Sequence, residues 1–113
     1  MNDCIFCKII AGEIPSDTLY SDDTVLAFND INPQAPVHFL VIPKVHIESA
    51  GEISSNNSEV VGKCFEVISK LAKERGMGTG FRVISNCGPD AGQTVDHLHF
   101  HVLSGKNLGE KLI

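Results

Sequence analysis

Three histidines alternate with apolar residues in the heptapeptide HLHFHVL at residues 97–103. Successive side chains of a β-strand point to opposite faces of the sheet. The run therefore predicts a strand with His97, His99 and His101 on one face and three apolar side chains in the core. The whole chain has 5 histidines, so three in register is a strong concentration. The pattern indicates a metal site, a catalytic or phosphate-binding imidazole cluster, or one of each.

The composition limits the class of protein. A chain of 113 residues with 42% hydrophobic and 20% charged residues fits one globular domain spanning residues 1–113. A net charge of −5 argues against a nucleic-acid partner, but is compatible with a small nucleotide in a pocket. No signal peptide or membrane-spanning run is visible, so we expect a cytoplasmic protein without a membrane partner. In that compartment the four cysteines are expected to be thiols or metal ligands.

The order of the predicted elements indicates an α+β fold with a mainly antiparallel sheet of five strands. A helical turn is expected at 4–11, a short helix within 46–53, and one long amphipathic helix at 59–75 that ends at Gly76. The strands are expected at 17–20, 24–28, 37–42, 81–86 and 96–103, with Pro43 ending the third of them.

Cys4 and Cys7 form a Cys-x-x-Cys pair, a spacing at which two thiolates can bind one zinc ion. A redox dithiol or two half-buried cysteines would give the same spacing. Zinc requires two further ligands, and His46 and His97 are the candidates, because one follows the third predicted strand and the other opens the histidine run. This spacing is not that of a zinc finger.

His99 and His101 form a candidate catalytic pair. A neutral imidazole can attack phosphorus, provided that its other nitrogen stays protonated through a hydrogen bond. A second imidazole two residues along the strand can bind the phosphate or carry the proton of the leaving group. The alternative places all three histidines of the run on one metal.

Polar residues just before the histidine run could hold an anion. Asn86 supplies an amide, Gln93 and Thr94 supply an amide and a hydroxyl, and Gly92 exposes backbone N–H groups. Ordinary turn residues are the alternative interpretation. His38 is isolated on an apolar strand, and its default interpretation is a core histidine with one hydrogen bond.

Taken together, these residues resemble the histidine triad (HIT) superfamily of nucleotide hydrolases and transferases, and its Hint branch in particular. The histidine run matches the family signature. The resemblance extends over nearly the whole chain through the motifs IFCKII, LAFNDI, PQAP, HFLVIPK and GQTV. It implies a HIT-like fold and a homodimer whose two sheets join into one. It also implies hydrolysis of purine nucleoside 5′-phosphoramidates to a nucleoside monophosphate and an amine, with no organic cofactor.

The resemblance assigns roles to residues by their motif positions. His99 would be the nucleophile, oriented by the backbone carbonyl of His97, and His101 would contact the phosphate, with His38 supporting the pair. Bacterial relatives place structural zinc at the positions of Cys4, Cys7, His46 and His97. Nucleotide-binding positions are phosphate-binding Asn86, Gly92, Gln93 and Thr94, ribose-binding Asp30, and base-binding Phe6, Ile9, Phe28 and Ile31.

The chain departs from the Hint pattern at three places. Thr94 stands where Ser is usual, Asp96 adds a negative charge beside the phosphate positions, and the tail at 104–113 lacks tryptophan. Two other functions fit the same residues. One is a dinucleoside polyphosphate hydrolase or nucleotidyl transferase that uses His99, and the other is a zinc-stabilised nucleotide-binding module without turnover.

Overall fold

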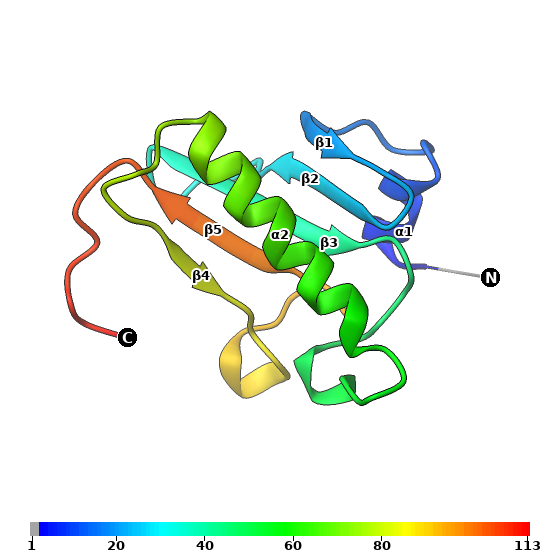
Figure 1. The fold of residues 1–113 in the computed structure, drawn as a ribbon. Helices are drawn as coiled ribbons and strands as arrows, with labels where there is room; N and C mark the ends of the chain where they lie inside the picture. The colour runs from blue at the N-terminus through cyan, green and yellow to red at the C-terminus, as the bar shows by residue number, and fades with distance from the viewer. Residues whose placement is uncertain (1–2) are drawn as a thin grey trace.

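Five antiparallel strands form one sheet in the order β1-β2-β3-β5-β4 in the computed structural model, which describes residues 3–113 (Figure 1). The strands are β1 Thr18–Ser21, β2 Val25–Asn29, β3 Val37–Pro43, β4 Arg82–Ile84 and β5 Phe100–Ser104. The helix α1 comprises Ile5–Ile10, and the long helix α2 comprises Ser58–Glu74. The α+β fold predicted from the sequence is confirmed.

The central strands are buried on both faces of the sheet. Figure 1 shows α2 lying across one face, where it covers Val25, Phe39 and Val41. On the opposite face Phe6 of α1 packs with apolar side chains of β2 and β3. This double burial explains why β2 and β3 are near-continuous apolar runs in the sequence instead of alternating ones.

The histidine run keeps its predicted alternation but is not wholly a strand. Leu98, Phe100 and Val102 are buried in the core beneath α2. Within β5, His101 pairs with Leu40 of β3. The predicted strand at 96–103 begins too early, because β5 starts at Phe100 and the chain at 95–97 forms a bend.

The observed boundaries of other helices and strands differ slightly from the predicted ones. Gly12 and Gly76 follow α1 and α2 with φ of 80° and 68°, as expected for glycines that end helices. Pro43 is the last residue of β3 and not its terminator, since it still pairs with Val25. β4 is shorter than predicted, and the segment 46–53 forms only the 3-10 turn Ala50–Glu52. Within residues 3–113, no helix has both the length and the apolar character needed to cross a bilayer.

Candidate active site and metal centre

Cys4, Cys7, His46 and His97 converge at the N-terminal end of α1. Nδ1 of His97 lies 3.4 Å from Sγ of Cys4, 3.5 Å from Sγ of Cys7 and 3.2 Å from Nδ1 of His46. Nδ1 of His46 lies 3.3 Å from Sγ of Cys7. Four ligand atoms of the types that zinc prefers therefore face one point, and this arrangement can hold a tetrahedral metal ion.

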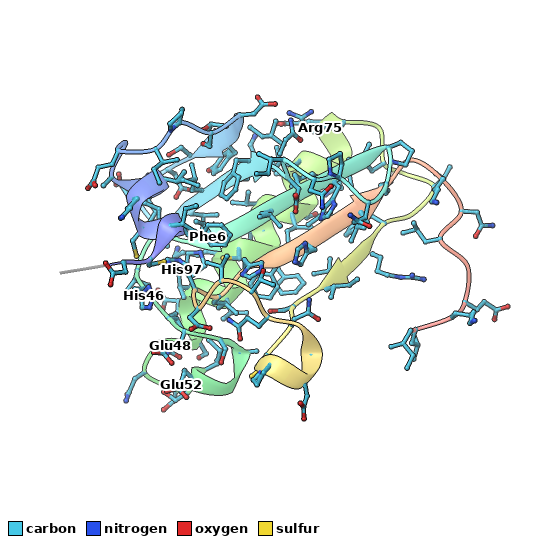
Figure 2. All side chains as sticks on the ribbon, turned by 180° about the vertical axis from the view of Figure 1, so that it is seen from behind. Phe6, His46, Glu48, Glu52, Arg75 and His97 are labelled. Carbon is cyan, nitrogen blue, oxygen red and sulfur yellow. The ribbon has the colours of Figure 1, made fainter. Side chains whose placement is uncertain are left out.

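The proton on His97 is in the right place for metal binding. Nε2 of His97 lies 2.8 Å from the carbonyl oxygen of Pro43, which can only accept, so this nitrogen carries the proton. Nδ1 is left as a lone pair facing the cysteines, and such a second hydrogen bond is typical of metal-binding histidines. Burial is the largest cause that lowers the pKa of His97 and favours its neutral form. Figure 2 shows His97 between Phe6 and His46.

A second group of metal-ligating types consists of Asp30, His38 and His101. The backbone N–H of Gln34 donates to Nδ1 of His38 at 3.0 Å. A metal on Nε2 of His38 would have to displace the proton there, and Nδ1 cannot receive it while that N–H points at it. This group therefore fits a metal less well than the cysteine-containing cluster does.

His99 is buried, and one of its nitrogens is fixed. Its Nδ1 lies 2.7 Å from the carbonyl oxygen of His97, so Nδ1 carries the proton and Nε2 holds a lone pair. The ring of Phe6 packs edge-on against it, with centroids 5.1 Å apart. A neutral imidazole with its reactive nitrogen unprotonated and its ring immobilised is the arrangement that a histidine nucleophile requires.

His101 lies beside His99, with ring centroids 5.0 Å apart. Nε2 of buried His38 lies 2.9 Å from Nδ1 of His101, and Oδ2 of Asp30 lies 3.4 Å from the same Nε2. Burial, followed by the proximity of His99 and His38, lowers the pKa of His101 to about 4, although Asp30 opposes this shift. His38 is thus part of the histidine cluster and not an isolated core residue.

The predicted base-binding side chains are not all together. Phe6 and Phe28 stack edge to face with centroids 5.6 Å apart, and Ile9 packs against the same cluster. Ile31 is fully exposed, at 101% of its reference area, in the loop that follows β2. Ile31 is therefore not part of the apolar cluster that holds Phe6, Phe28 and Ile9.

The predicted anion loop is braced by Gln93. Its side-chain oxygen accepts from the N–H of Gly88, and its Nε2 donates to the carbonyls of Glu48 and Val95 at 2.7 and 3.0 Å. Gly92 has a φ of 82°, a conformation that favours glycine. Gln93 therefore sets the shape of the loop and ties it to the segment that carries His46.

Thr94 and Asp96 line a cavity of about 370 Å³ beside the metal cluster. Glu48 and Asp3 line the same cavity, so its rim is acidic. Asp96 thus lies on the metal side of the loop. Another cavity, of about 650 Å³, lies near Arg75, far from His97 in Figure 2.

Comparison with known proteins identifies the family. A sequence profile described as "Scavenger mRNA decapping enzyme C-term binding" matches residues 3–112. A histidine triad protein from Clostridium difficile, with a solved structure, is 55% identical and superposes with a TM-score of 0.94 over 98% of this chain and 97% of that chain. The chain belongs to the histidine triad (HIT) family. The sequence-based recognition is confirmed.

Two other HIT proteins are similar along almost their whole length. A HIT family hydrolase from Clostridium thermocellum is 46% identical, with a TM-score of 0.97 over 100% of this chain and 99% of that one. The purine nucleoside phosphoramidase of Escherichia coli K12 is 44% identical over 109 residues, which are 96% of this chain and 92% of the relative.

Several groups that shape this HIT site have no side-chain signal in the sequence. They are the carbonyls of Pro43 and Glu48 and the N–H of Gln34. Sequence patterns report side-chain types, so backbone donors and acceptors of this kind become visible only in the folded chain.

Proposed function

We propose that this protein hydrolyses purine nucleoside 5′-phosphoramidates to a nucleoside monophosphate and an amine, through a nucleotidyl intermediate on His99. The observation that carries the proposal is the 2.7 Å contact from Nδ1 of His99 to the carbonyl of His97, which leaves Nε2 as the nucleophile. The similarity to a relative named purine nucleoside phosphoramidase supports the substrate class.

The reaction has two displacement steps. Nε2 of His99 attacks phosphorus and forms an N–P bond, while the P–N bond of the substrate breaks and the amine departs with a proton taken up from solvent. The N–H of His101 donates a hydrogen bond to the phosphate during this step. Water then attacks the phosphorus of the intermediate and the bond between phosphorus and Nε2 of His99 breaks. The oxygen of that water stays on the nucleoside monophosphate, one of its protons returns to solvent, and His99 is regenerated.

Substrate binding would involve both sides of the histidine cluster. The carboxylate of Asp30 suits the two adjacent hydroxyls of a ribose, and the base would lie against Phe6, Ile9 and Phe28 with Ile31 closing over it. Thr94 would hold the phosphate, together with Asn86 and backbone groups at Gly92 and Gln93. The half-buried position of Asp30 next to His38 supports this arrangement.

Zinc is the metal that we propose for Cys4, Cys7, His46 and His97. Two thiolates and two imidazoles are a zinc donor set, and four protein ligands make the role structural. When bound, the ion would supply a cross-link between α1, the segment after β3 and the start of the histidine run. Phe6, one residue before Cys7, would thereby be held against His99.

We also propose a homodimer in which the two sheets join through β4. The strand lies at one edge of the sheet. Phe81 directly before it is 42% exposed, and Phe65 on α2 is 45% exposed. Edge strands with exposed aromatic neighbours are suited to pairing with a second chain. Sedimentation of wild-type protein and the Phe81→Asp variant tests this, and a monomeric wild-type protein would refute it.

The deciding experiment is intact-mass spectrometry after mixing with an adenosine 5′-phosphoramidate, alongside measurement of released AMP. We expect turnover and a transient adenylate adduct that maps to His99. His99→Ala should lose at least about 10³-fold in kcat while still binding AMP. No turnover by the wild-type protein would refute the proposal. Diadenosine polyphosphate is the comparison substrate. If the protein hydrolyses it faster than the phosphoramidate, the protein is a dinucleoside polyphosphate hydrolase instead.

A further inference from the structure

The backbone N–H of Gln34 lies outside the histidine run but touches the histidine cluster. Gln34 lies in the loop between β2 and β3, and its N–H donates to Nδ1 of His38 in β3 at 3.0 Å. The loop is held in shape by Asp30, whose Oδ1 accepts from the N–H of Asn32 at 2.8 Å and whose own N–H donates to the carbonyl of His38. The N–H is therefore a fixed donor.

A donor at Nδ1 decides where the proton of His38 lies. A neutral imidazole has one N–H and one lone pair, so a nitrogen that accepts from Gln34 leaves the proton on Nε2. That Nε2 lies 2.9 Å from Nδ1 of His101. His38 must therefore donate in this contact and His101 must accept, which leaves the proton of neutral His101 on Nε2.

The charged neighbour favours the same arrangement. Oδ2 of Asp30 lies 3.4 Å from Nε2 of His38 and 3.9 Å from Nδ1 of His101. The carboxylate is closer to the nitrogen of His38, so it favours the proton on that nitrogen. The ring of His99, with its centroid 5.0 Å from that of His101, has its own tautomer set by the His97 carbonyl. The Gln34 N–H is at hydrogen-bonding distance from Nδ1 of His38 and fixes the lone pair there.

We propose that the Gln34 N–H is a positioning group that sets the tautomers of both His38 and His101, so that His101 presents an N–H donor to the substrate. The inference rests on the proposed function for its catalytic consequence. In the opposite arrangement Nε2 of His101 would be a lone pair facing phosphate oxygens. It could then donate no hydrogen bond to the phosphate.

The tautomers are measured directly in the wild-type protein by long-range proton–nitrogen NMR of 15N-labelled histidines at neutral pH. We expect the proton on Nε2 in His38 and His101 and on Nδ1 in His99. A proton on Nδ1 of His38 or His101 would overturn the inference. This readout requires no substrate, so failure of the proposed reaction and failure of this inference are separate results.

Gln34→Pro removes the N–H, and Gln34→Ala keeps it, which makes the two a matched pair. We expect the proline variant to show a changed or mixed tautomer at His38 and a loss in kcat of about five- to tenfold, with KM nearly unchanged. The alanine variant should retain wild-type tautomers and kcat. The inference would be overturned if a folded proline variant had the same histidine spectrum and the same kcat as the alanine variant. If the proline variant does not fold, the tautomers measured in the wild-type protein decide the question.

Discussion

The carbonyl oxygen of His97 lies 2.7 Å from Nδ1 of His99, while the imidazole of His97 faces Cys4 and Cys7. One residue thus serves two clusters, with its backbone in one and its side chain in the other. The two functions are separable by mutation, because a substitution at this position changes the ring and keeps the carbonyl.

His97→Ala should lose metal but retain the orientation of His99. The ring is fully buried, so its removal should also cost about 3 kcal/mol or more of folding free energy. At a temperature where the variant is folded, kcat should stay within about tenfold of wild type. Metal analysis and adduct mass check this. His97→Cys is the control, since it should keep metal, and loss of the His99 adduct in both variants would contradict the separation.

Removing one thiolate should destabilise the fold. Cys4→Ser is expected to lower both the metal content and the melting temperature, because the proposed ion links α1 to segments about 40 and 90 residues away. A chelator should reproduce the shift in the wild-type protein. Cys87→Ser is the matched control, because that cysteine is exposed and outside the cluster. Freshly purified protein without metal, or equal melting of the two variants, would argue against a structural ion.

Acid should destabilise the protein through His101. Its pKa is lowered from 6.5 to about 4, chiefly by burial, so between these values the unfolded chain binds more protons than the folded one. The contribution of this residue is therefore complete above pH 6.5 and declines as the pH falls toward 4. Urea unfolding of wild type and His101→Asn checks this. The free-energy difference between the two proteins should shrink over that interval, and a constant difference would refute the assignment.

Gly105 should tolerate substitution less well than Gly109. Both have positive φ, 95° and 78°, so alanine at either position costs about 1–2 kcal/mol. A Cβ at Gly105 would also lie 2.8 Å from Cβ of Pro36, whereas one at Gly109 meets nothing within 4 Å. We expect Gly105→Ala to cost about 1–3 kcal/mol more in chemical unfolding. Equal losses of unfolding free energy in the two variants would mean that the backbone near Pro36 moves to accommodate the added Cβ.

The sequence predicted most elements because their signals are local. Helix α2 has apolar residues at helical spacing and Gly76 at its end, and the histidine run keeps its alternation even where strand pairing has not begun. The ligand set of the metal cluster was also predictable, because few suitable residues were available. Ile31 was grouped with Phe6 by motif position, but its full exposure depends on the loop conformation.

The proton arrangement could not be predicted in the same way. The residue pattern alone left His38 as an isolated core residue, and the family resemblance placed it with the catalytic pair, but neither predicted its contact with the Gln34 N–H. The contacts of His38 with Gln34 and His101 depend on the geometry of a loop and on the register between β3 and β5. No pattern of residue types specifies which backbone group faces a particular ring nitrogen.

The metal cluster joins the two ends of the sequence, since Cys7 and His97 are 90 residues apart. During synthesis Cys7 of α1 is made 90 residues before His97, and the strand β5 follows His97. Contacts of such long sequence separation are slow to form, because chain closure must precede the energy they provide. The nascent chain therefore carries Cys4, Cys7 and Phe6 before the segment around His97 has been made. Binding of the proposed metal by all four ligands would follow the synthesis of that segment.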